Sequence, residues 1–309
     1  MTALRVTKGH GTENDFVLLP DLDGTRPLTP ELVAALCDRR AGLGADGVIR
    51  VVRTAALVAA GDVAPSDGLA VAEWFMDYRN ADGSLAEMCG NGVRVFVAYL
   101  LREGLVSLAD GEDVAVGTRA GIKRVRRDGD LLAADLGPWF VTGDEVSVAV
   151  PGEPAGLPGL GVDVGNPHVV VALPDAEALA AADLTRAPVL DPVPPAGANV
   201  ELIVPLATPD DDVGHLLMRV HERGSGETRS CGTGAVAAVL AARVWGGEQA
   251  PDEWLVDVPG GRLRVRVEAA AVRSGAHVEL AGPAVLVADA VVDRAALALP
   301  RSPAGEPAR

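Results

Sequence analysis

Two short stretches, Cys89-Gly90-Asn91-Gly92-Val93 and Cys231-Gly232-Thr233-Gly234-Ala235, share one pattern: cysteine, glycine, a small polar residue, glycine and an apolar residue. Each opens a run that is apolar nearly all round, at residues 93–100 and 235–242, and a helix of that kind is buried. The two cysteines are separated by nearly half of the chain. The repeat therefore predicts two related halves, each with strands wrapped around one central helix.

The fold class that follows is α+β, with two pseudo-symmetric domains of mostly antiparallel strands. We expect one domain to consist of residues 1–134 and 284–297 and to carry Cys89. The other is expected to consist of residues 135–283 and to carry Cys231. Residues 298–309 are predicted to be a disordered tail, because chain ends without apolar anchors are poorly ordered.

Turn-forming residues place the remaining elements. Thr29 followed by Pro30 predicts a helix start, and this helix is expected to run to about Arg40. Residues 54–70 are rich in alanine, glycine, proline, serine and aspartate and predict a surface insertion. Glycine and proline predict loops at 151–161 and 186–198.

Composition excludes several classes of protein. The 309 residues carry a formal net charge of −16, so a nucleic-acid phosphate backbone would be repelled. No apolar run reaches the roughly 20 residues of a membrane helix, and the first residues lack the pattern of a signal peptide. We therefore expect a cytoplasmic protein with neither nucleic-acid nor membrane partners.

The three cysteines do not suggest disulfides or zinc, because they are few, scattered and without histidine clusters. Cys37 lies on the apolar face of the helix predicted from Pro30, and we interpret it as structural. Only Lys8 and Lys123 are lysines, which argues against pyridoxal phosphate, since that cofactor needs a Schiff-base lysine. No cofactor and no metal are expected.

A cysteine at a helix N-terminus faces unpaired N–H groups and the positive end of the helix dipole, which should lower its pKa. The free amides of the residues after each cysteine would bind an anion such as a carboxylate. Two such ends facing each other would hold one α-carboxylate between two thiols. That arrangement suits inversion of an α-carbon, in which one thiolate removes a proton and the opposite thiol returns one.

With these motifs the sequence resembles the diaminopimelate epimerase family, within a superfamily that includes proline racemase. The resemblance covers about residues 3 to 290. It rests on Gly11-Thr12-Glu13-Asn14-Asp15-Phe16, Asn80-Ala81-Asp82-Gly83-Ser84, Gly165-Asn166-Pro167-His168 and Glu222-Arg223-Gly224, together with both cysteine motifs. It implies interconversion of LL- and meso-2,6-diaminopimelate without cofactor, in lysine and cell-wall precursor synthesis. It also implies an active site in the cleft between two domains, and a homodimer.

The resemblance also assigns residues. Cys89 and Cys231 match the catalytic pair, and His168 and Glu222 match polar groups near the reacting centre. The positions that match substrate-binding residues are Asn14, Asn80, Asn166, Asn199, Glu222 and Arg223, and the helix-end amides match Gly90, Asn91, Gly232 and Thr233. Two departures stand out: Thr12-Glu13 replaces a shorter glycine-rich turn, and Gly47 follows Asp46 where a polar ligand is common.

Several alternatives remain open at this point. Taken singly, the asparagines could be turn residues, His168 a core histidine and Glu222-Arg223 a solvated charge pair. The runner-up enzyme is a proline or hydroxyproline racemase, although those relatives typically have histidine where Asn91 stands. From other classes, the chain could be a redox protein that pairs Cys89 with Cys231, or an amino-acid-binding protein.

Overall fold

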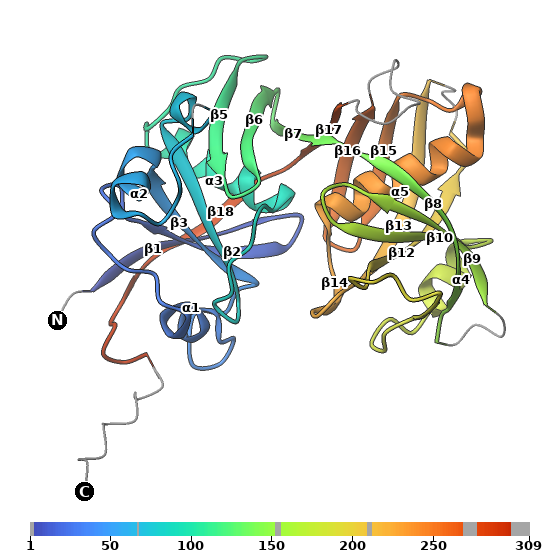
Figure 1. Cartoon of the computed structure of the whole chain (residues 1–309), viewed down its shortest axis with the longest axis horizontal. Coiled ribbons are helices and arrows are strands. Elements are labelled where there is room, and N and C mark those ends of the chain that lie inside the picture. Colours follow the sequence, from blue (N-terminus) through green and yellow to red (C-terminus); the bar gives the residue numbers. More distant parts are fainter. Residues whose placement is uncertain (1–2, 67, 152–155, 209–211, 268–276, 298–309) are drawn as a thin grey trace, which may run out of the picture.

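The computed structural model describes residues 3–66, 68–151, 156–208, 212–267 and 277–297. The predicted disordered tail, residues 298–309, lies outside the described residues. The chain forms two lobes side by side, with one long helix inside each (Figure 1). The predicted α+β class is confirmed, while the residue limits of the two domains stay a prediction.

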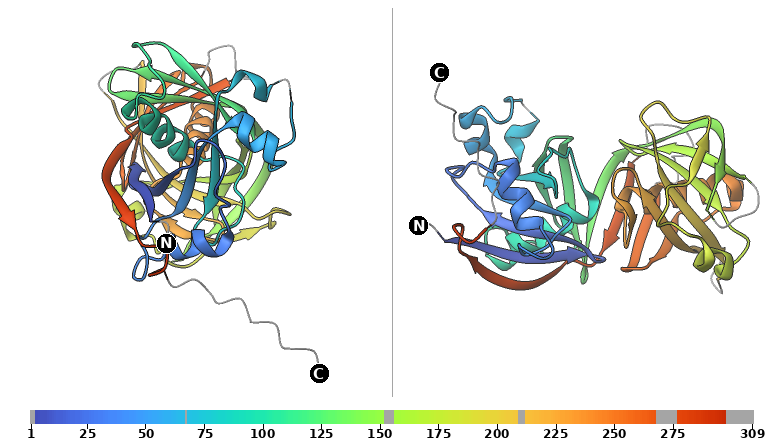
Figure 2. Two further views of the ribbon diagram at one scale, coloured as in Figure 1. Left: turned by 90° about the vertical axis from the view of Figure 1, so that its left-hand side faces the viewer. Right: turned by 90° about the horizontal axis from the view of Figure 1, so that it is seen from below.

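The first lobe contains the Cys89 motif. Its strands are β1 (Leu4–Gly11), β2 (Asn14–Pro20), β3 (Gly47–Arg53), β4 (Trp74–Asn80), β5 (Asp113–Thr118), β6 (Gly121–Asp128), β7 (Leu131–Pro138) and β18 (Val285–Val292). Its helices are α1 (Pro30–Cys37), α2 (Thr54–Ala60), the 3₁₀ turn η1 (Leu69–Val71) and the central α3 (Gly90–Arg102). The last strand, β18, returns to this lobe and pairs with β1 (Figure 2).

The second lobe contains the Cys231 motif. Its strands are β8 (Phe140–Ala149), β9 (Leu157–Asp163), β10 (Pro167–Ala172), β11 (Val189–Asp191), β12 (Asn199–Leu206), β13 (Val213–Glu222), β14 (Gly226–Thr228), β15 (Glu253–Val258), β16 (Gly261–Val267) and β17 (His277–Gly282). Its helices are α4 (Ala176–Ala181), the central α5 (Gly232–Gly246) and the 3₁₀ turn η2 (Gly247–Gln249).

The strand pairing of one lobe repeats that of the other. In the first lobe, β1–β2 is antiparallel, β2–β3 parallel, β3–β4 antiparallel, β4–β5 parallel, and β5–β6 and β6–β7 antiparallel. In the second lobe, the same order of directions runs through β9, β10, β12, β13, β15, β16 and β17. The two series meet where β7 pairs antiparallel with β17 between the lobes (Figure 1). The internal repeat read from two short motifs is therefore a repeat of the whole sheet.

The two central helices are the core of the molecule. Every residue of α3 from Gly90 to Val97 is buried, and so is every residue of α5 from Gly234 to Ala242. Their side chains belong to one apolar cluster that continues through both lobes. No helix in the described part of the chain is long and apolar enough to cross a membrane.

The helix start at Thr29 is confirmed, because its hydroxyl accepts from the amide of Leu32 at 3.3 Å. The predicted end near Arg40 is wrong. The helix stops at Cys37, and the carboxylate of Asp38 then accepts from the amides of Arg40 and Ala41. The side chain of Asp38 thus competes with the helix for those amides.

The predicted surface insertion and both predicted loops contain regular structure. Residues 54–60 form α2, where good helix formers surround the fully buried Leu57 and Gly61 ends the helix in a left-handed conformation. Part of 151–161 forms β9, which pairs with β8 and β10. Part of 186–198 forms the short β11, paired with β8. The helix thus follows the local preference of alanine, while in the two strands a tertiary partner overrides that of glycine and proline.

Candidate functional site

Cys89 is the N-cap of α3. Its Sγ accepts from the amide of Gly92 at 3.4 Å, and its thiol lies 3.6 Å from Oδ1 of Asn14. Asn14 begins β2, so the site on this side is built from one helix start and one strand start. The sequence expectation of a cysteine at a helix N-terminus agrees with this geometry.

Cys231 is the N-cap of α5 in the same manner. Its Sγ accepts from the amide of Gly234 at 3.4 Å and lies 3.5 Å from the hydroxyl of Thr233. Glu222, at the end of β13, faces the same thiol, since a hydrogen bond with Cys231 contributes to the pKa of its carboxyl group.

The two helix starts lie against each other. A Cβ added to Gly90 would lie 3.8 Å from Cα of Gly232, and one added to Gly232 would lie 3.5 Å from the amide nitrogen of Asn91. The side-chain amide of Asn91 donates across the boundary to the carbonyl of Ser230 at 3.3 Å. The tightest contact of both added atoms would be with Cδ2 of Leu280, at 3.1 Å from Gly90 and 2.9 Å from Gly232, so glycine at these positions leaves room for that side chain between the helix starts.

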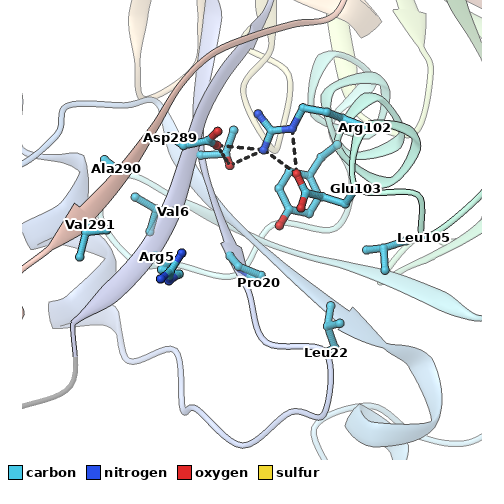
Figure 3. Close-up of a pocket in the computed structure, with 12 residues that line it drawn as sticks. Arg5, Val6, Pro20, Leu22, Arg102, Glu103, Leu105, Asp289, Ala290 and Val291 are labelled. Carbon is cyan, nitrogen blue, oxygen red and sulfur yellow. Dashed lines mark hydrogen bonds and ion pairs between the residues drawn. The ribbon is translucent and has the colours of Figure 1, made fainter.

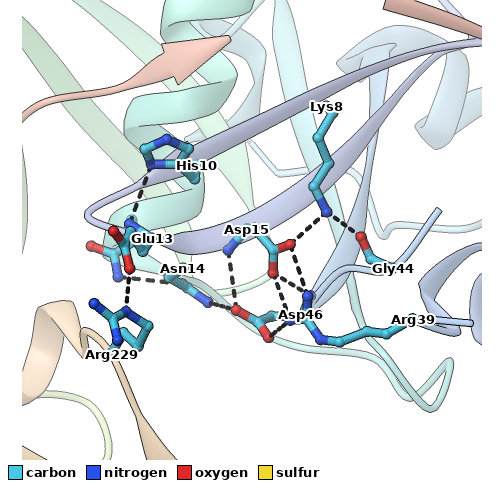
Figure 4. Close-up of polar contacts among 10 residues, drawn as sticks. Lys8, His10, Glu13, Asn14, Asp15, Arg39, Gly44, Asp46 and Arg229 are labelled. Carbon is cyan, nitrogen blue, oxygen red and sulfur yellow. Dashed lines mark hydrogen bonds and ion pairs between the residues drawn. The ribbon is translucent and has the colours of Figure 1, made fainter. Parts of the chain in front are cut away.

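A network of charges fixes the orientation of Asn14 (Figure 4). Its Nδ2 donates to Oδ2 of Asp46 at 2.8 Å, which turns Oδ1 toward Cys89. Arg39 bridges Asp46 and Asp15 with bonds of 2.7 and 2.8 Å. Lys8 and Arg39 beside Asp15 hold the pKa of that carboxyl at about 2, against the opposing effect of burial. Asp15 is therefore ionised at neutral pH, whereas burial raises the pKa of Asp46. The bond to Asp46 leaves the asparagine one orientation.

A buried pair of side chains lies beneath Cys231. Nδ1 of His168 is 2.7 Å from Oε1 of Glu201, and both side chains are fully buried. Nε2 of His168 is 3.1 Å from Oδ1 of Asn166. A Cβ added to Gly234 would lie 2.6 Å from Oε1 of Glu201, so this carboxylate touches the first turn of α5.

Asn199 and Arg223 lie beside this pair. Asn199 is in register with His168 across the parallel strands β12 and β10. Its Oδ1 accepts from the amide of Arg223 at 2.9 Å, and the guanidinium of Arg223 donates to the carbonyl of Ala196.

The predicted site residues occupy equivalent places in the two lobes. Phe16 is in register with Gly47, and His168 is in register with Asn199. Asn14 lies two residues before Phe16 and Asn166 lies two residues before His168, so the two asparagines are equivalent. Gly47 is opposite Asn80. In the second lobe, Val200 of β12 pairs with His221 of β13 in antiparallel register. Extending this register by one residue places Glu222 opposite Asn199, so Glu222 is equivalent to Asn80. Among the described contacts, Asn80 is bonded to Ser84 at 3.0 Å and not to the other predicted site residues.

The expectation of lowered thiol pKa values is wrong for the free protein. Burial raises the pKa of Cys89 to about 11, although the amides of Gly92 and Asn91 lower it as predicted. Burial, followed by the charges of Glu222 and Glu201, raises the pKa of Cys231 well above its usual value. The helix ends act in the predicted direction, but desolvation of the thiolate is the larger effect at both cysteines.

Sequence reasoning did not single out Glu201, Arg94, Asp46 or Ser230. Glu201 and Arg94 had a signal: each is one charged residue inside an apolar run, and both are fully buried. Asp46 and Ser230 had none, because their importance comes from partners distant in sequence.

A cavity of about 520 Å³ lies elsewhere in the first lobe, lined in part by Arg5, Tyr99, Arg102 and Asp289 (Figure 3). Arg102 is the last residue of the 13-residue α3 and Cys89 is its N-cap. The rise of ~1.5 Å per residue separates them by about 20 Å. This cavity is therefore distinct from the cysteine site. No group of three or more metal-ligating side chains occurs among the residues that the structure describes.

Solved structures with the same fold match nearly the whole chain. A Bacillus anthracis phenazine biosynthesis protein of the PhzF family superposes with a TM-score of 0.69 at 17% identity, covering 94% of this chain and 99% of its own. A hydroxyproline epimerase from Agrobacterium vitis superposes with a TM-score of 0.60 at 16% identity, covering 94% and 92%. At these identities the likeness concerns the fold alone.

Sequence relatives are much closer. The profile of the diaminopimelate epimerase family matches residues 6–138 and 161–287. Diaminopimelate epimerases from Thermobifida fusca and Streptomyces coelicolor are 51% and 48% identical, each over 95% of this chain and over 100% and 97% of their own length. Fold and relatives together define an isomerase that epimerises amino acids. The chain belongs to the diaminopimelate epimerase family.

Proposed function

We propose that the protein interconverts LL- and meso-2,6-diaminopimelate by proton transfer between the substrate α-carbon and two thiols, those of Cys89 and Cys231. One observation carries the proposal: each thiol caps a buried helix, and the first turns of these helices lie against each other across the two lobes. A substrate held there would have one thiol on each face of its α-carbon.

In the proposed reaction, the thiolate of one cysteine takes the α-proton while the thiol of the other donates a proton to the opposite face. One C–H bond breaks as an S–H bond forms, and the reverse exchange occurs at the second sulfur. In the opposite direction the two cysteines exchange roles. The amides of Gly90, Asn91, Gly232 and Thr233 would stabilise the charge that grows on the α-carboxylate.

The second charged end of diaminopimelate needs its own partners. Arg223 can bind a carboxylate in bidentate fashion, and Glu222 can accept from an ammonium group. Asn14, Asn80, Asn166 and Asn199 would supply further donors and acceptors, and His168 would orient Asn166 beside them. The family resemblance also predicts a homodimer, an amino-acid substrate and a reaction without a cofactor, and these stay predictions.

A proline or hydroxyproline racemase is the second candidate. Its support is the shared fold of the hydroxyproline epimerase, at 16% identity. The diaminopimelate epimerases that are 51% and 48% identical to this chain favour diaminopimelate as the substrate.

The test is solvent exchange with purified, reduced protein. LL-diaminopimelate is incubated in D₂O, and α-deuterium and the meso product are followed. We expect inversion with deuterium uptake in the wild type and in Cys37→Ala, whose thiol is buried in α1. We expect Cys89→Ala and Cys231→Ala each to lose about 10²–10⁴-fold in kcat, the usual contribution of a general acid or base. Exchange of proline but not of diaminopimelate would contradict the proposal.

A further inference from the structure

Arg94 is a buried cation with no acidic partner in the part of the chain that the structure describes. Its side chain is fully buried in the first turns of α3. One terminal nitrogen donates to the carbonyl of Gly90 at 3.1 Å and the other to Oδ1 of Asn91 at 2.8 Å, while Nε has no hydrogen-bond partner. Among the described residues it forms no ion pair with a carboxylate, in contrast to the buried Arg50, which pairs with Asp77 at 2.8 Å.

Such a residue is costly to bury, since an unpaired charge loses its hydration. Burial lowers the pKa of Arg94 to about 10, so the guanidinium still carries its charge at neutral pH. The guanidinium of Arg94 and the thiolate of Cys89 attract each other. This attraction raises the pKa of Arg94 and lowers the pKa of Cys89.

The second lobe has no equivalent cation. Arg94 follows Cys89 by five residues, and the residue five after Cys231 is Val236, which is fully buried in apolar surroundings. The thiol of Cys231 instead faces the carboxylates of Glu222 and Glu201, both of which disfavour its thiolate. Nδ1 of His168 lies 2.7 Å from Oε1 of Glu201 in the same surroundings.

The other groups around Cys89 are common to both sides or uncharged. Glu222 disfavours the thiolate of Cys89 as it does that of Cys231. Oδ1 of Asn14 accepts from the protonated thiol, and Tyr78 of β4 is neutral, because burial raises its pKa well above its usual value. The two thiols therefore differ in their charged neighbours: Cys89 has the positive Arg94 nearby, whereas Cys231 has the negative Glu201.

We propose that Arg94 is a positioning residue of this site, whose buried charge favours the thiolate of Cys89 so that Cys89 ionises before Cys231. The order of ionisation is a property of the free protein. Its consequence, that Cys89 supplies the first base when substrate binds, rests on the proposed function.

The test measures each thiol separately without substrate. The full-length protein is treated with iodoacetamide at several pH values between 7 and 9, and alkylation of Cys89 and Cys231 is quantified by peptide mass spectrometry. This range lies below the pKa of both thiols and of Arg94, so Arg94 is charged and the alkylation rate is proportional to the small thiolate fraction. Each variant is compared with the wild type at the same thiol, so that differences in access between the two thiols cancel. A raised pKa lowers the rate, and we expect Arg94→Gln to slow alkylation of Cys89 about tenfold or more and to change that of Cys231 less.

Arg94→Lys keeps the charge and should leave the alkylation rate of Cys89 close to that of the wild type. Arg102→Gln removes a charge at the far end of the same helix and should change neither alkylation rate. The proposal is overturned if folded Arg94→Gln leaves the alkylation rate of Cys89 unchanged, or slows Cys231 as much as Cys89. Should Arg94→Gln fail to fold, a loss of about tenfold at Cys89 in folded Arg94→Lys overturns it equally. None of these results depends on diaminopimelate turnover, so failure of the proposed function is detected separately by the D₂O experiment.

Discussion

The two helix starts have the same backbone and different surroundings. Beneath Cys89, a Cβ added to Gly92 would contact Ile49 at 3.4 Å and Phe16 at 3.5 Å, both fully buried and apolar. At the equivalent place beneath Cys231 lie the carboxylate of Glu201 and its partner His168.

This difference separates two tasks. The repeated sheet and helix place each sulfur at a helix N-terminus, which any sequence with the same glycines could do. The side chains below decide how readily each sulfur ionises and how much disturbance each half tolerates. Three pairs of substitutions would sharpen or break this comparison.

The largest difference is expected between Gly234→Ala and Gly92→Ala. At Gly234 the new methyl would lie 2.6 Å from Oε1 of Glu201, so the carboxylate must shift and its bond to His168 is lost. Overpacking of this kind costs about 1–3 kcal/mol. We expect Gly234→Ala to unfold at lower denaturant concentration and to lose most activity.

At Gly92 the nearest atoms would lie at 3.3 to 3.5 Å, and alanine favours a helix. Gly92→Ala should therefore change the free energy of unfolding by less than about 1 kcal/mol. Equal effects of the two substitutions in urea unfolding would show that Glu201 does not constrain the second half as described.

An intermediate effect is expected from Asp46→Asn, which has no counterpart in the second half, where Ala198 precedes Asn199. The new amide oxygen can still accept from the amide of Asn14, but it lacks the negative charge that strengthens this bond and pairs with Arg39, so the orientation of Asn14 toward Cys89 is held less firmly. A hydrogen bond to a charged group is worth about 1.5–3 kcal/mol, so we expect kcat/KM to fall about tenfold or more.

Arg39→Gln is the matched control, because it removes the exposed end of the same network and leaves Asp46 in place. Its loss of kcat/KM should be clearly smaller. If both variants lose activity equally, the network acts as a whole and Asp46 has no special link to Asn14.

The smallest effect is expected where the halves touch at the surface. Glu13 pairs with Arg229, and both side chains are about half exposed. An exposed pair contributes about 0–1 kcal/mol, so Arg229→Ala should lower the free energy of unfolding by less than 1 kcal/mol and leave kcat within about twofold. Arg262→Gln, which breaks an exposed pair with Asp257 inside one lobe, is the control. A large loss of activity in Arg229→Ala alone would mean that this pair holds the two helix ends together.

Much of the site could be predicted from the sequence. The cysteines, the glycines after them and the apolar runs lie within a few residues of one another, and a helix start is a local structure. The asparagines came from the family resemblance, and their placement at strand ends agrees with the parallel registers of β2–β3 and β10–β12.

The sequence by itself determined that there are two matched halves, each with a thiol at the start of a buried helix. This was possible because the cysteine, the glycines and the apolar residues of each motif are adjacent in the chain. Only the tertiary structure decided that the halves differ in charge. Arg94 reaches Asn91 within its own helix, but Glu201, His168 and Glu222 come to Cys231 from three separate strands. Desolvation and charge both depend on what surrounds an atom in space, and burial outweighed the helix ends at both thiols.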